Sequence, residues 1–323
     1  MKRFIAMTVS LVLLLSLAVS CAEPVQAAAE NRTTVITAHF ASVEEGQALM
    51  RGKTLYYEQV NEKDLAFLMQ KKDGTIGELI DYEAEQVMAF TAEDEQRISD
   101  GLAWLQQQLE SHGLKLPDPG MVTFVKTTGK EATGAGGYTS EGNVFLTSVL
   151  FERADDDLFR DILIHEISHC LSRLFPEYRA ALYDLIHFRV LDADIDIPQE
   201  IRDQFIANPD VEHHNSVAAF TVNGEKKECY LVFMTDDVFE NPGDNFFRHK
   251  YTGVVPLGES VVYRAEDVTD FWDVVGSNTD YAEDPEEIMA TNFALAIMNL
   301  DKGYESFKSP EILEGIIDYL KTE

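Results

Sequence analysis

Basic residues are few for a chain of this length. There are 26 lysines and arginines against 57 aspartates and glutamates, which gives a formal net charge of −31. The acidic residues are spread along the chain instead of forming one tail. A nucleic-acid partner needs a basic footprint, and an anionic membrane face attracts basic segments. We therefore expect neither partner, and we interpret the acidic surface as an aid to solubility.

Cysteine is scarce as well, with only Cys21, Cys170 and Cys229 among 323 residues. A chain of this size with three cysteines does not depend on a disulfide framework. Cys170 follows His169 in a segment that we predict to be helical, and its side chain points away from the face of that histidine. We interpret Cys170 as a small buried hydrophobic residue. Nothing in the sequence supports a disulfide between Cys170 and Cys229.

Long apolar runs are absent except near the N-terminus, where Phe4–Val19 follows Lys2 and Arg3. The run is short for a membrane span and has the position of a secretory signal, so we predict an exported bacterial protein. Two processing sites compete. The stretch that ends at Cys21 resembles a lipobox, which would lipidate this cysteine and attach the protein to the membrane. Residues 25–27 instead resemble a cleavage site that frees a secreted protein, and we slightly favour the lipoprotein.

Three segments are expected along the chain. Residues 1–27 form the signal, residues 28–115 a mainly helical N-terminal region, and residues 116–323 a larger domain. Thr91 and the acidic residues after it predict the start of a long helix. The stretch 116–120, rich in proline and glycine, is interpreted as a linker after that helix. Hydrophobic residues make up 45% of the sequence, which is enough for a sizeable core.

Strands and helices alternate after the linker. The glycine-rich stretch 129–137 lacks the setting of a phosphate-binding loop, so we interpret it as a flexible turn. Asn223-Gly224 predicts a hairpin between two strands within 217–233. Further strands are predicted at 121–125 and 143–147, and helices at 156–174, at 177–188 and from Asp284-Pro285 and Ser309-Pro310 onward.

The segment 161–171, DILIHEISHCL, places polar residues inside an apolar helix. His165 and His169 are four residues apart and share one helix face, so both imidazoles can approach one metal ion. Glu166 is rotated by about a third of a turn and can reach a water molecule on that metal without being a ligand. This arrangement is the His-Glu-x-x-His motif of zinc metalloproteases, in which the glutamate takes the proton of the water.

Burying the polar side chains of this motif without partners would cost free energy, which argues against a chance occurrence. Each polar group buried without a partner costs about 1–3 kcal/mol or more. A metal supplies the partner for His165 and His169, and we therefore predict Zn²⁺ as the cofactor. The alternative is a core histidine pair that is bonded to backbone or carboxylate groups.

A catalytic zinc usually has three protein ligands and one open position. A third histidine six residues after His169 would suit one known pattern, but Phe175 stands there. Glu287 is the candidate that we favour, although it lies three residues after Asp284 and could instead close a helix end in a capping box. His187 is the rival ligand, and packing in its apolar surroundings is the more ordinary role for it.

The motif around His165, together with a preceding strand and the stretch Tyr281…Glu287-Ile288-Met289-Ala290, resembles the gluzincin metallopeptidases, with the lethal-factor-like branch nearest in pattern. The resemblance covers roughly residues 120–300. It implies an α+β fold with a zincin-like catalytic domain, in which the active-site helix lies beside a small, mostly antiparallel sheet. The helical region 28–115 would be added to that domain.

The same resemblance implies roles for single residues. His165, His169 and Glu287 would hold zinc, Glu166 would be the general base, and Tyr281 would donate a hydrogen bond to the oxyanion. The branch often has an acidic residue directly after the Ala and supports a ligand histidine with it, but this chain has Thr291 and Asn292 there, a departure that concerns the support of the ligands. The chain is also similar to uncharacterised exported bacterial proteins that share the motif and a turn like Asn208-Pro209-Asp210.

We therefore expect an exported zinc metallopeptidase that acts on a peptide or protein substrate. A non-catalytic cell-surface binding protein with a structural zinc helix is the alternative, and a zinc hydrolase for non-peptide bonds is a third reading. Two further clusters are interpreted as surface features. His213-His214 is predicted to be a solvent-facing loop pair instead of a substrate contact. Arg248-His249-Lys250 is predicted to be a patch of surface salt bridges instead of a carboxylate site.

Overall fold

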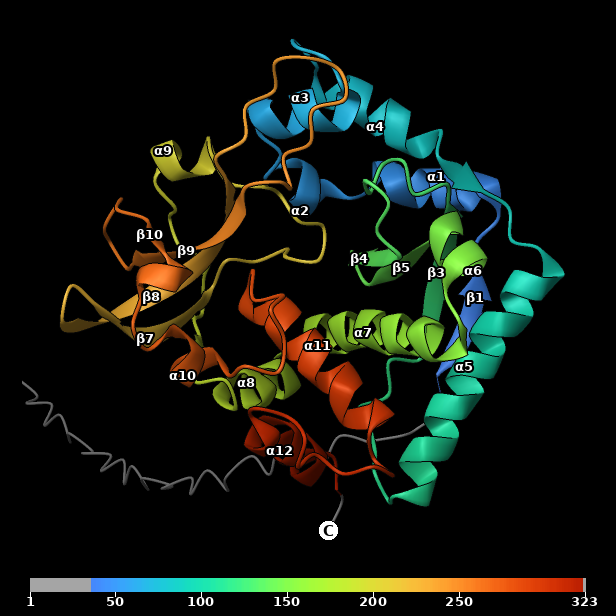
Figure 1. The fold of residues 1–323 in the computed structure, drawn as a ribbon. Coiled ribbons are helices and arrows are strands. Elements are labelled where there is room, and N and C mark those ends of the chain that lie inside the picture. Colours follow the sequence, from blue (N-terminus) through green and yellow to red (C-terminus); the bar gives the residue numbers. More distant parts are fainter. Residues whose placement is uncertain (1–35, 322–323) are drawn as a thin grey trace, which may run out of the picture. The chain divides into compact units, whose positions relative to one another are not determined.

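A computed structural model describes residues 36–321 of the chain (Figure 1). The predicted signal segment 1–27, with Cys21, lies outside the described residues. The described part combines helices with two β-sheets, so the α+β prediction is confirmed in its general form. Within the described range, no helix has the length and apolar character needed to cross a membrane.

Helices occur throughout the described range. They are α1 (Val43–Arg51), α2 (Thr54–Tyr57), α3 (Glu62–Met69), α4 (Ile76–Ala84), α5 (Ala92–Ser111), α6 (Ser148–Arg153), α7 (Asp156–Leu174), α8 (Pro176–Asp184), α9 (Gln199–Arg202), α10 (Phe271–Val275), α11 (Pro285–Met298) and α12 (Pro310–Leu320), with a short 3₁₀ turn η1 (Ala265–Asp267). The predicted helix at 156–174 is confirmed as α7. The helix predicted at 177–188 ends earlier than expected, and His187 lies in the turn after it with φ +62°.

The first sheet is mixed. It consists of β1 (Thr37–Phe40), β2 (Val87–Met88), β3 (Met121–Thr127), β4 (Gly137–Ser140) and β5 (Asn143–Thr147). Its order is β1-β3-β5-β4, with β2 paired to β3. The strands β1, β3 and β5 run parallel, and β4 pairs with β5 in the antiparallel sense at the edge.

We expected a mostly antiparallel sheet beside the motif helix, but this sheet is mixed. The glycine-rich stretch also differs from the prediction, because its last residue, Gly137, begins β4. A β-carbon at Gly137 would lie 3.1 Å from Glu166 Oε1, a tight contact that would require the Glu166 side chain to shift, so the glycine favours the close approach of the strand to α7.

The second sheet is antiparallel throughout. It consists of β6 (Arg189–Val190), β7 (Ser216–Val222), β8 (Glu225–Thr235), β9 (Lys250–Pro256) and β10 (Tyr263–Arg264), in the order β10-β9-β8-β7-β6. The predicted hairpin is confirmed between β7 and β8. Asn223 and Gly224 both have positive φ, 52° and 82°, as the tight turn between two strands requires.

The helices α7 and α11 cross at the centre of the large hydrophobic core (Figure 1). The helix α7 lies between α11 and the strands β4 and β5. Most residues of α11 are buried, which is expected of a helix that is apolar on all sides. The buried polar residues of both helices therefore have to find partners in the protein.

The stretch 116–120, which we interpreted as a domain boundary, lies inside one compact unit that includes every described residue. The strand β1 pairs with β3 on the other side of this stretch. The helix α5 packs on α7 at Gly101, where a β-carbon would lie 2.6 Å from Leu163 Cδ2. The region before residue 116 also contributes two strands, β1 and β2, that we did not predict.

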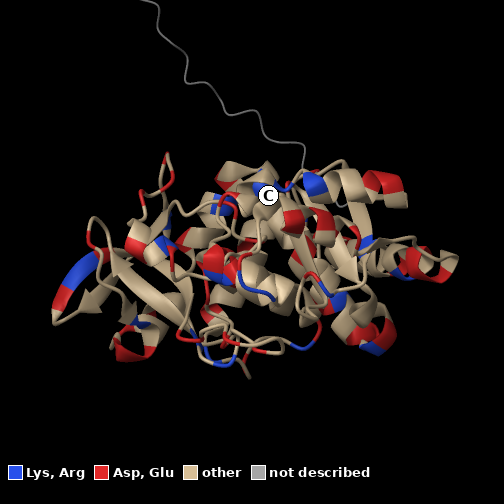
Figure 2. Ribbon diagram, turned by 90° about the horizontal axis from the view of Figure 1, so that it is seen from above, with Lys and Arg blue, Asp and Glu red and all other residues tan. Residues whose placement is uncertain are grey.

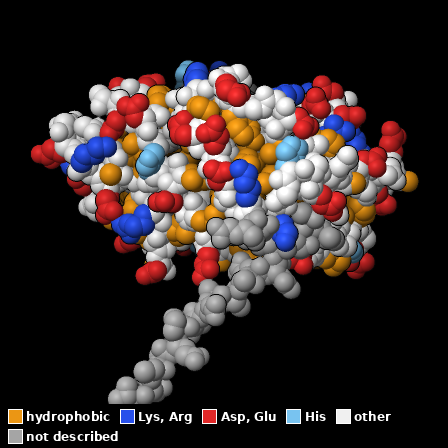
Figure 3. All heavy atoms as spheres, turned by 90° about the horizontal axis from the view of Figure 1, so that it is seen from below, with side chains coloured by type: hydrophobic (Ala, Val, Ile, Leu, Met, Phe, Trp, Pro, Cys, Tyr) orange, Lys and Arg blue, Asp and Glu red, His pale blue; other side chains and the backbone are white. Residues whose placement is uncertain are grey.

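The distribution of the acidic side chains and the state of the two described cysteines agree with the predictions made from the sequence. Acidic side chains are distributed over many of the helices and loops (Figure 2), and they are scattered over the face shown in Figure 3 with apolar side chains between them. Cys170 and Cys229 are both free and buried, so no disulfide joins them.

Candidate metal centre

The helix α7 carries both motif histidines toward α11. The helix starts at Asp155, whose side chain accepts a hydrogen bond from the backbone N–H of Leu158, and it ends at Leu174, before Pro176. The four-residue spacing places the rings of His165 and His169 one above the other, with centroids 4.7 Å apart. Their Nε2 atoms lie 3.0 Å from each other.

Glu287 of α11 joins this pair. Its Oε2 lies 3.1 Å from Nε2 of His165 and 3.7 Å from Nε2 of His169. One donor atom from each of the three residues lies within 4.8 Å of the other two. His169 is 0% and Glu287 1% exposed. The structure therefore brings together the three residues that the sequence nominated as metal ligands.

The described residues form neither the capping box at Glu287 nor a contact of His187 with the histidine pair, whereas the contacts of His165 and His169 with carboxylates also agree with a metal-free core pair. In the capping box, Glu287 would reach back to the backbone of Asp284. Instead, the Asp284 side chain accepts the backbone N–H of Glu286, and the Glu287 carboxylate turns toward His165. His187, the rival ligand, has its Nδ1 2.9 Å from the backbone oxygen of Val274 and does not belong to the group of donors.

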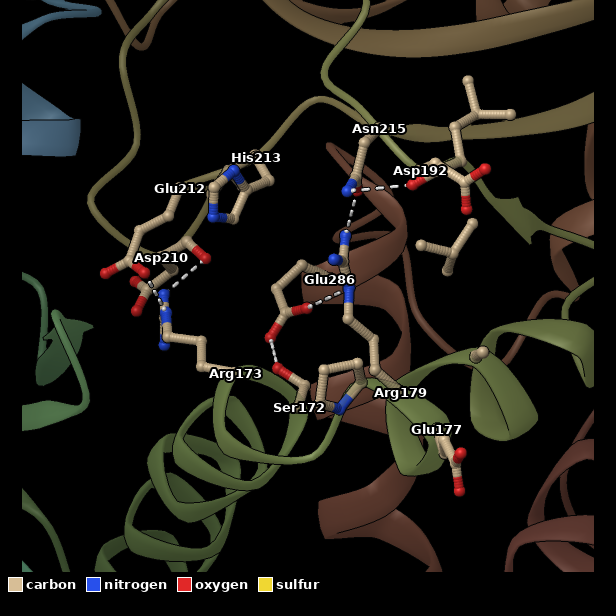
Figure 4. Close-up of a pocket in the computed structure, with 15 residues that line it drawn as sticks. Ser172, Arg173, Glu177, Arg179, Asp192, Asp210, Glu212, His213, Asn215 and Glu286 are labelled. Atoms are coloured by element: carbon tan, nitrogen blue, oxygen red, sulfur yellow. Dashed lines mark hydrogen bonds and ion pairs between the residues drawn. The ribbon is translucent and has the colours of Figure 1, made fainter. Parts of the chain in front are cut away.

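Glu286, which was not among the predicted site residues, supports His169 from the other side of the ring. Its Oε1 lies 2.8 Å from Nδ1 of His169. Ser172 donates a hydrogen bond to the same oxygen, and Nε of Arg179 lies 3.8 Å from Oε2 (Figure 4). Tyr183 donates a hydrogen bond to Oε2 as well. This contact fixes the ring of His169 and leaves Nε2 directed at Glu287.

The expected position of such support was after Ala290. There, Asn292 donates to the backbone oxygen of Ile288 on its own helix, and within residues 36–321 it forms no hydrogen bond with a histidine. The support comes instead from the residue directly before Glu287. The sequence offered one signal for it, the acidic pair Glu286-Glu287 after Pro285, which we read only as a helix start.

The charges of the cluster favour a cation at its centre. Burial opposes ionisation of Glu286, but the contact with His169 and the charges of Arg173 and Arg179 outweigh it and lower its pKa to about 2. In the same way, His165 and His169 hold the pKa of Glu287 well below its usual value despite burial.

His169 responds in the opposite direction. Burial alone would lower its pKa, but the carboxylates of Asp210, Glu286 and Glu287 raise it well above the usual value. The carboxylates thus favour the protonated form of this ring. A divalent cation between the same donors would replace the charge of that proton.

Glu166 lies next to the three donors but is not one of them. Its side chain is buried, and Oε2 accepts a hydrogen bond of 2.8 Å from the hydroxyl of Thr139 on β4. Burial raises the pKa of Glu166, while the nearby charges of His165 and His169 oppose the increase. The carboxylate is therefore held beside the cluster, and its pKa lies above the usual value for a glutamate.

Tyr281 lies at the rim of the cluster. Its hydroxyl is 3.5 Å from Oε1 of Glu287, and the residue is 39% exposed. The ammonium of Lys250 lies 5.5 Å from the centre of the ring. The residue nominated as the oxyanion donor is therefore close to the cluster and open to solvent.

The turn Asn208-Pro209-Asp210 is a second part of the site that the sequence did not assign. Asn208 donates a hydrogen bond of 2.6 Å to Oε1 of Glu287. Asp210 Oδ1 accepts the backbone N–H of Thr139 at 2.6 Å and lies 3.8 Å from Nε2 of His169. Asp210, Glu166 and His169 form a second group of donors within 4.8 Å of one another.

The segment that contains this turn follows the outer edge of β4, on the side away from β5. Thr139 and Glu141 direct alternate N–H groups away from β5, and the carboxylates of Asp210 and Glu212 accept them. Arg173 at the end of α7 holds the segment, with Nη2 donating to the Asp210 backbone oxygen and Nε 2.9 Å from Glu212 (Figure 4). The edge of the sheet next to the motif is thus occupied by the chain itself.

The remaining clusters differ in outcome. His213 is exposed and pairs with Asp194, as predicted, but His214 turns inward to Gln59, and burial lowers its pKa to about 4. The basic island forms ion pairs as predicted, with Lys250 Nζ 2.9 Å from Glu283 and His249 against an aspartate.

Comparison of the chain with protein-family models, with curated proteins and with solved structures found no match. The donor set itself is therefore the basis for judging a metal. Two imidazole nitrogens and one carboxylate oxygen are the ligands that a catalytic zinc prefers. The ring of His169 is fixed through its second nitrogen, as ligand histidines usually are. The residues present fit a zinc ion.

Proposed function

We propose that the protein is a zinc-dependent metallopeptidase with a zincin-like catalytic domain. The observation that carries the proposal is the convergence of His165, His169 and Glu287 from two crossing helices, with Glu166 beside them. His165, His169 and Glu287 would hold the metal. When bound, zinc would act as a Lewis acid that polarises a carbonyl and makes water a nucleophile near neutral pH.

Glu166 is the general base in this proposal. Thr139 holds one of its carboxylate oxygens, and the absence of a side chain at Gly137 keeps space beside the other. Its raised pKa brings it closer to the pH at which it takes a proton from water and then passes it to the leaving amine. A residue that only filled space at this position would not need to be a carboxylate.

Tyr281 is the proposed hydrogen-bond donor to the oxygen that gains charge during the reaction. It has a phenolic hydroxyl at the rim of the cluster, where a substrate can approach. A donor aimed at this oxygen commonly contributes about 10²–10³ in rate.

A peptide substrate would approach the cluster from the rim at Tyr281. The edge of β4 passes beside Glu166, but its outward N–H groups at Thr139 and Glu141 already bond to the carboxylates of Asp210 and Glu212. Tyr281 contacts Glu287 and is open to solvent, so a substrate carbonyl group can reach the cluster there. The expectation of export rests on residues 1–27, which lie outside the described range.

Asp210 is the observation that favours the second candidate, a binding protein with a structural zinc. Its carboxylate is near enough to His169 to become a fourth protein ligand after a small movement. A structural zinc is closed by four such ligands, whereas a catalytic zinc keeps one position open. The absorption spectrum of the cobalt-substituted protein separates the two cases, because an open position binds added azide or cyanide.

The test of the enzyme is Glu166→Gln. The variant should retain about one zinc per chain and the fold of the wild type, while losing hydrolytic activity by about 10²–10⁴-fold or more, because the amide cannot accept a proton. Glu152→Gln, an exposed residue on α6, is the control and should behave as the wild type. Cleavage of a peptide library by Glu166→Gln at the wild-type rate would exclude Glu166 as the base. Equal, negligible zinc in the wild type, His165→Ala and His169→Ala would exclude the metal centre.

A further inference from the structure

A small cavity borders the metal centre on the side of β4. Its volume is about 120 Å³, enough for one long side chain. Gly137 lines it and lies against Glu166, and Asn208 and Tyr281 line it and contact Glu287. A group bound in the cavity would therefore be next to the proposed site of reaction.

Apolar surface makes up slightly more than half of the cavity wall. Side chains from six separate parts of the chain contribute to it, namely Tyr56, Leu68, Tyr138, Ile206, Phe233 and Phe247. Such walls suit the aliphatic stem of a long side chain, which gains from leaving water even when its end is charged.

The charged residues of the lining are mostly acidic. Four carboxylates, Glu83, Glu131, Asp210 and Glu283, stand against one lysine, Lys53. Lys53 is committed to Glu83, since its Nζ lies 2.6 Å from Oε2 of that residue. The ammonium also faces the rings of two lining tyrosines, at 4.5 and 5.0 Å from their centres. The lysine therefore neutralises one carboxylate and is held in place.

Glu131 has no cation of its own, although a hydrogen bond with Thr127 and the charge of Lys53, which is paired with Glu83, act on its carboxylate. It is 4% exposed, and it takes part in no ion pair among the described residues. Its Oε2 has no hydrogen-bond partner, and its Oε1 is 3.4 Å from the hydroxyl of Tyr138. Oε1 of Glu83 also lacks a partner. Buried carboxylates are normally paired, because an unpaired one costs free energy.

We propose that this cavity binds the lysine or arginine side chain of a peptide substrate, with Glu131 as the partner of its charged end. The proposal rests on the metallopeptidase function and names the substrate class of that site. A basic side chain supplies what the cavity lacks, a cation for Glu131, while its stem covers the apolar walls. An acidic side chain would face four carboxylates and one committed lysine, and a neutral one would leave Glu131 unpaired.

Paired substrates test the proposal. A peptide library first identifies sequences that the zinc-loaded full chain cleaves, and the lysine of a cleaved peptide is then replaced by norleucine, which has a similar stem without the ammonium. The wild type should prefer the lysine peptide by about 30-fold or more in kcat/KM, the size expected for a buried charge pair.

Variants assign the preference to the cavity. Glu131→Gln should remove most of the preference by slowing cleavage of the lysine peptide and not of the norleucine peptide. Thr133→Lys places a competing cation at an exposed residue of the lining, where folding is not at risk, and should have the same effect. The control is Glu85→Gln, an exposed carboxylate close in sequence to Glu83, which should retain the preference.

Binding to Glu166→Gln separates this proposal from the proposed activity. In this background, fluorescence anisotropy should show tighter binding of the lysine peptide than of the norleucine peptide, and Glu131→Gln should abolish the difference. Cleavage without any preference for basic residues would overturn the cavity assignment and leave the peptidase standing. If the library yields no cleaved peptide, binding is measured with an uncleaved lysine peptide and its norleucine counterpart, and selective binding that depends on Glu131 would then keep the cavity assignment and overturn the peptidase. Binding of both peptides with equal affinity would overturn the cavity assignment whatever the activity.

Discussion

Two buried polar clusters lie close together in this protein and differ in how their groups are satisfied. The histidine cluster consists of His165, His169, Glu286 and Glu287, and the lysine cluster consists of Lys53, Glu83 and Glu131. In the histidine cluster, donors from two helices converge on one point and the carboxylates are paired. In the lysine cluster, one ion pair is formed and two carboxylate oxygens remain without partners.

The difference shows what each cluster requires from outside the chain. Converging nitrogens and oxygens with fixed rings have the form of a site for a small resident cation. An unpaired carboxylate on a cavity has the form of a site that is completed only when a ligand enters. The first cluster is therefore expected to gain stability from a metal, and the second to cost stability until its ligand binds.

The largest effect is expected for the third ligand. Glu287→Gln should weaken zinc binding by orders of magnitude, because a neutral amide replaces the carboxylate that faces two imidazoles. Its melting temperature without metal should stay near that of the metal-free wild type. His187→Ala, outside the cluster, should retain zinc. Metal analysis after dialysis measures the zinc content of both variants. Zinc retained in Glu287→Gln but lost in His187→Ala would show that His187, and not Glu287, is the third ligand.

Removal of the cation from the lysine cluster should be the next largest effect. Lys53→Met leaves Glu83 buried without its partner, and the loss of one member of a buried pair costs about 3–5 kcal/mol of unfolding free energy. Lys71→Met breaks an exposed pair with Glu78 and should change stability little. Urea unfolding measures the two variants, and equal stabilities would show that the buried pair does not hold the cluster together.

A smaller effect is expected for the support of His169. Glu286→Gln should weaken zinc binding by about 10–100-fold, since such partners orient the ligand ring and raise its basicity. Thr291→Ala changes the position where the resemblance placed an acidic support, and it should leave the affinity unchanged. Competition with a zinc chelator gives both affinities. An unchanged affinity in Glu286→Gln would separate this contact from metal binding.

The smallest effect is a pH dependence of opposite sign in the two clusters. Burial raises the pKa of Glu131, so the folded state keeps a proton that the unfolded state loses as the pH rises above 4.5. This residue therefore makes the protein less stable as the pH rises, and Glu131→Gln should gain stability relative to the wild type between pH 4 and pH 8. Glu286, with a pKa of about 2, contributes stability above pH 4.5 that is lost as the pH falls.

Chemical unfolding at several pH values measures this dependence. The gain of Glu131→Gln should be absent near pH 4, where both states of the wild type are protonated, and should grow toward pH 8. A gain that is constant across the range would mean that the substitution acts by packing and not by charge.

Local sequence patterns predicted much of the secondary structure correctly. The helix with the motif, the hairpin at Asn223-Gly224 and the helix that begins at Pro285 follow from capping residues, turn residues and apolar periodicity, which act over a few residues. The edge strand β4 was missed because Gly137 looks like part of a turn in sequence. Residues 137–140 form a strand because they pair with β5, and Gly137 lies against the Glu166 side chain.

By itself, the sequence determined that His165, Glu166 and His169 lie on one helix, because a spacing of four residues fixes their relative direction wherever that helix packs. Only the tertiary structure decided which groups surround them. Glu286 reaches His169 from 117 residues away in the chain, and the N–H of Thr139 finds Asp210 across 71 residues. The crossing of α7 with α11 and the path of residues 208–212 along β4 make these contacts. Neither follows from local spacing, because both depend on how apolar surfaces from the whole chain pack into one core.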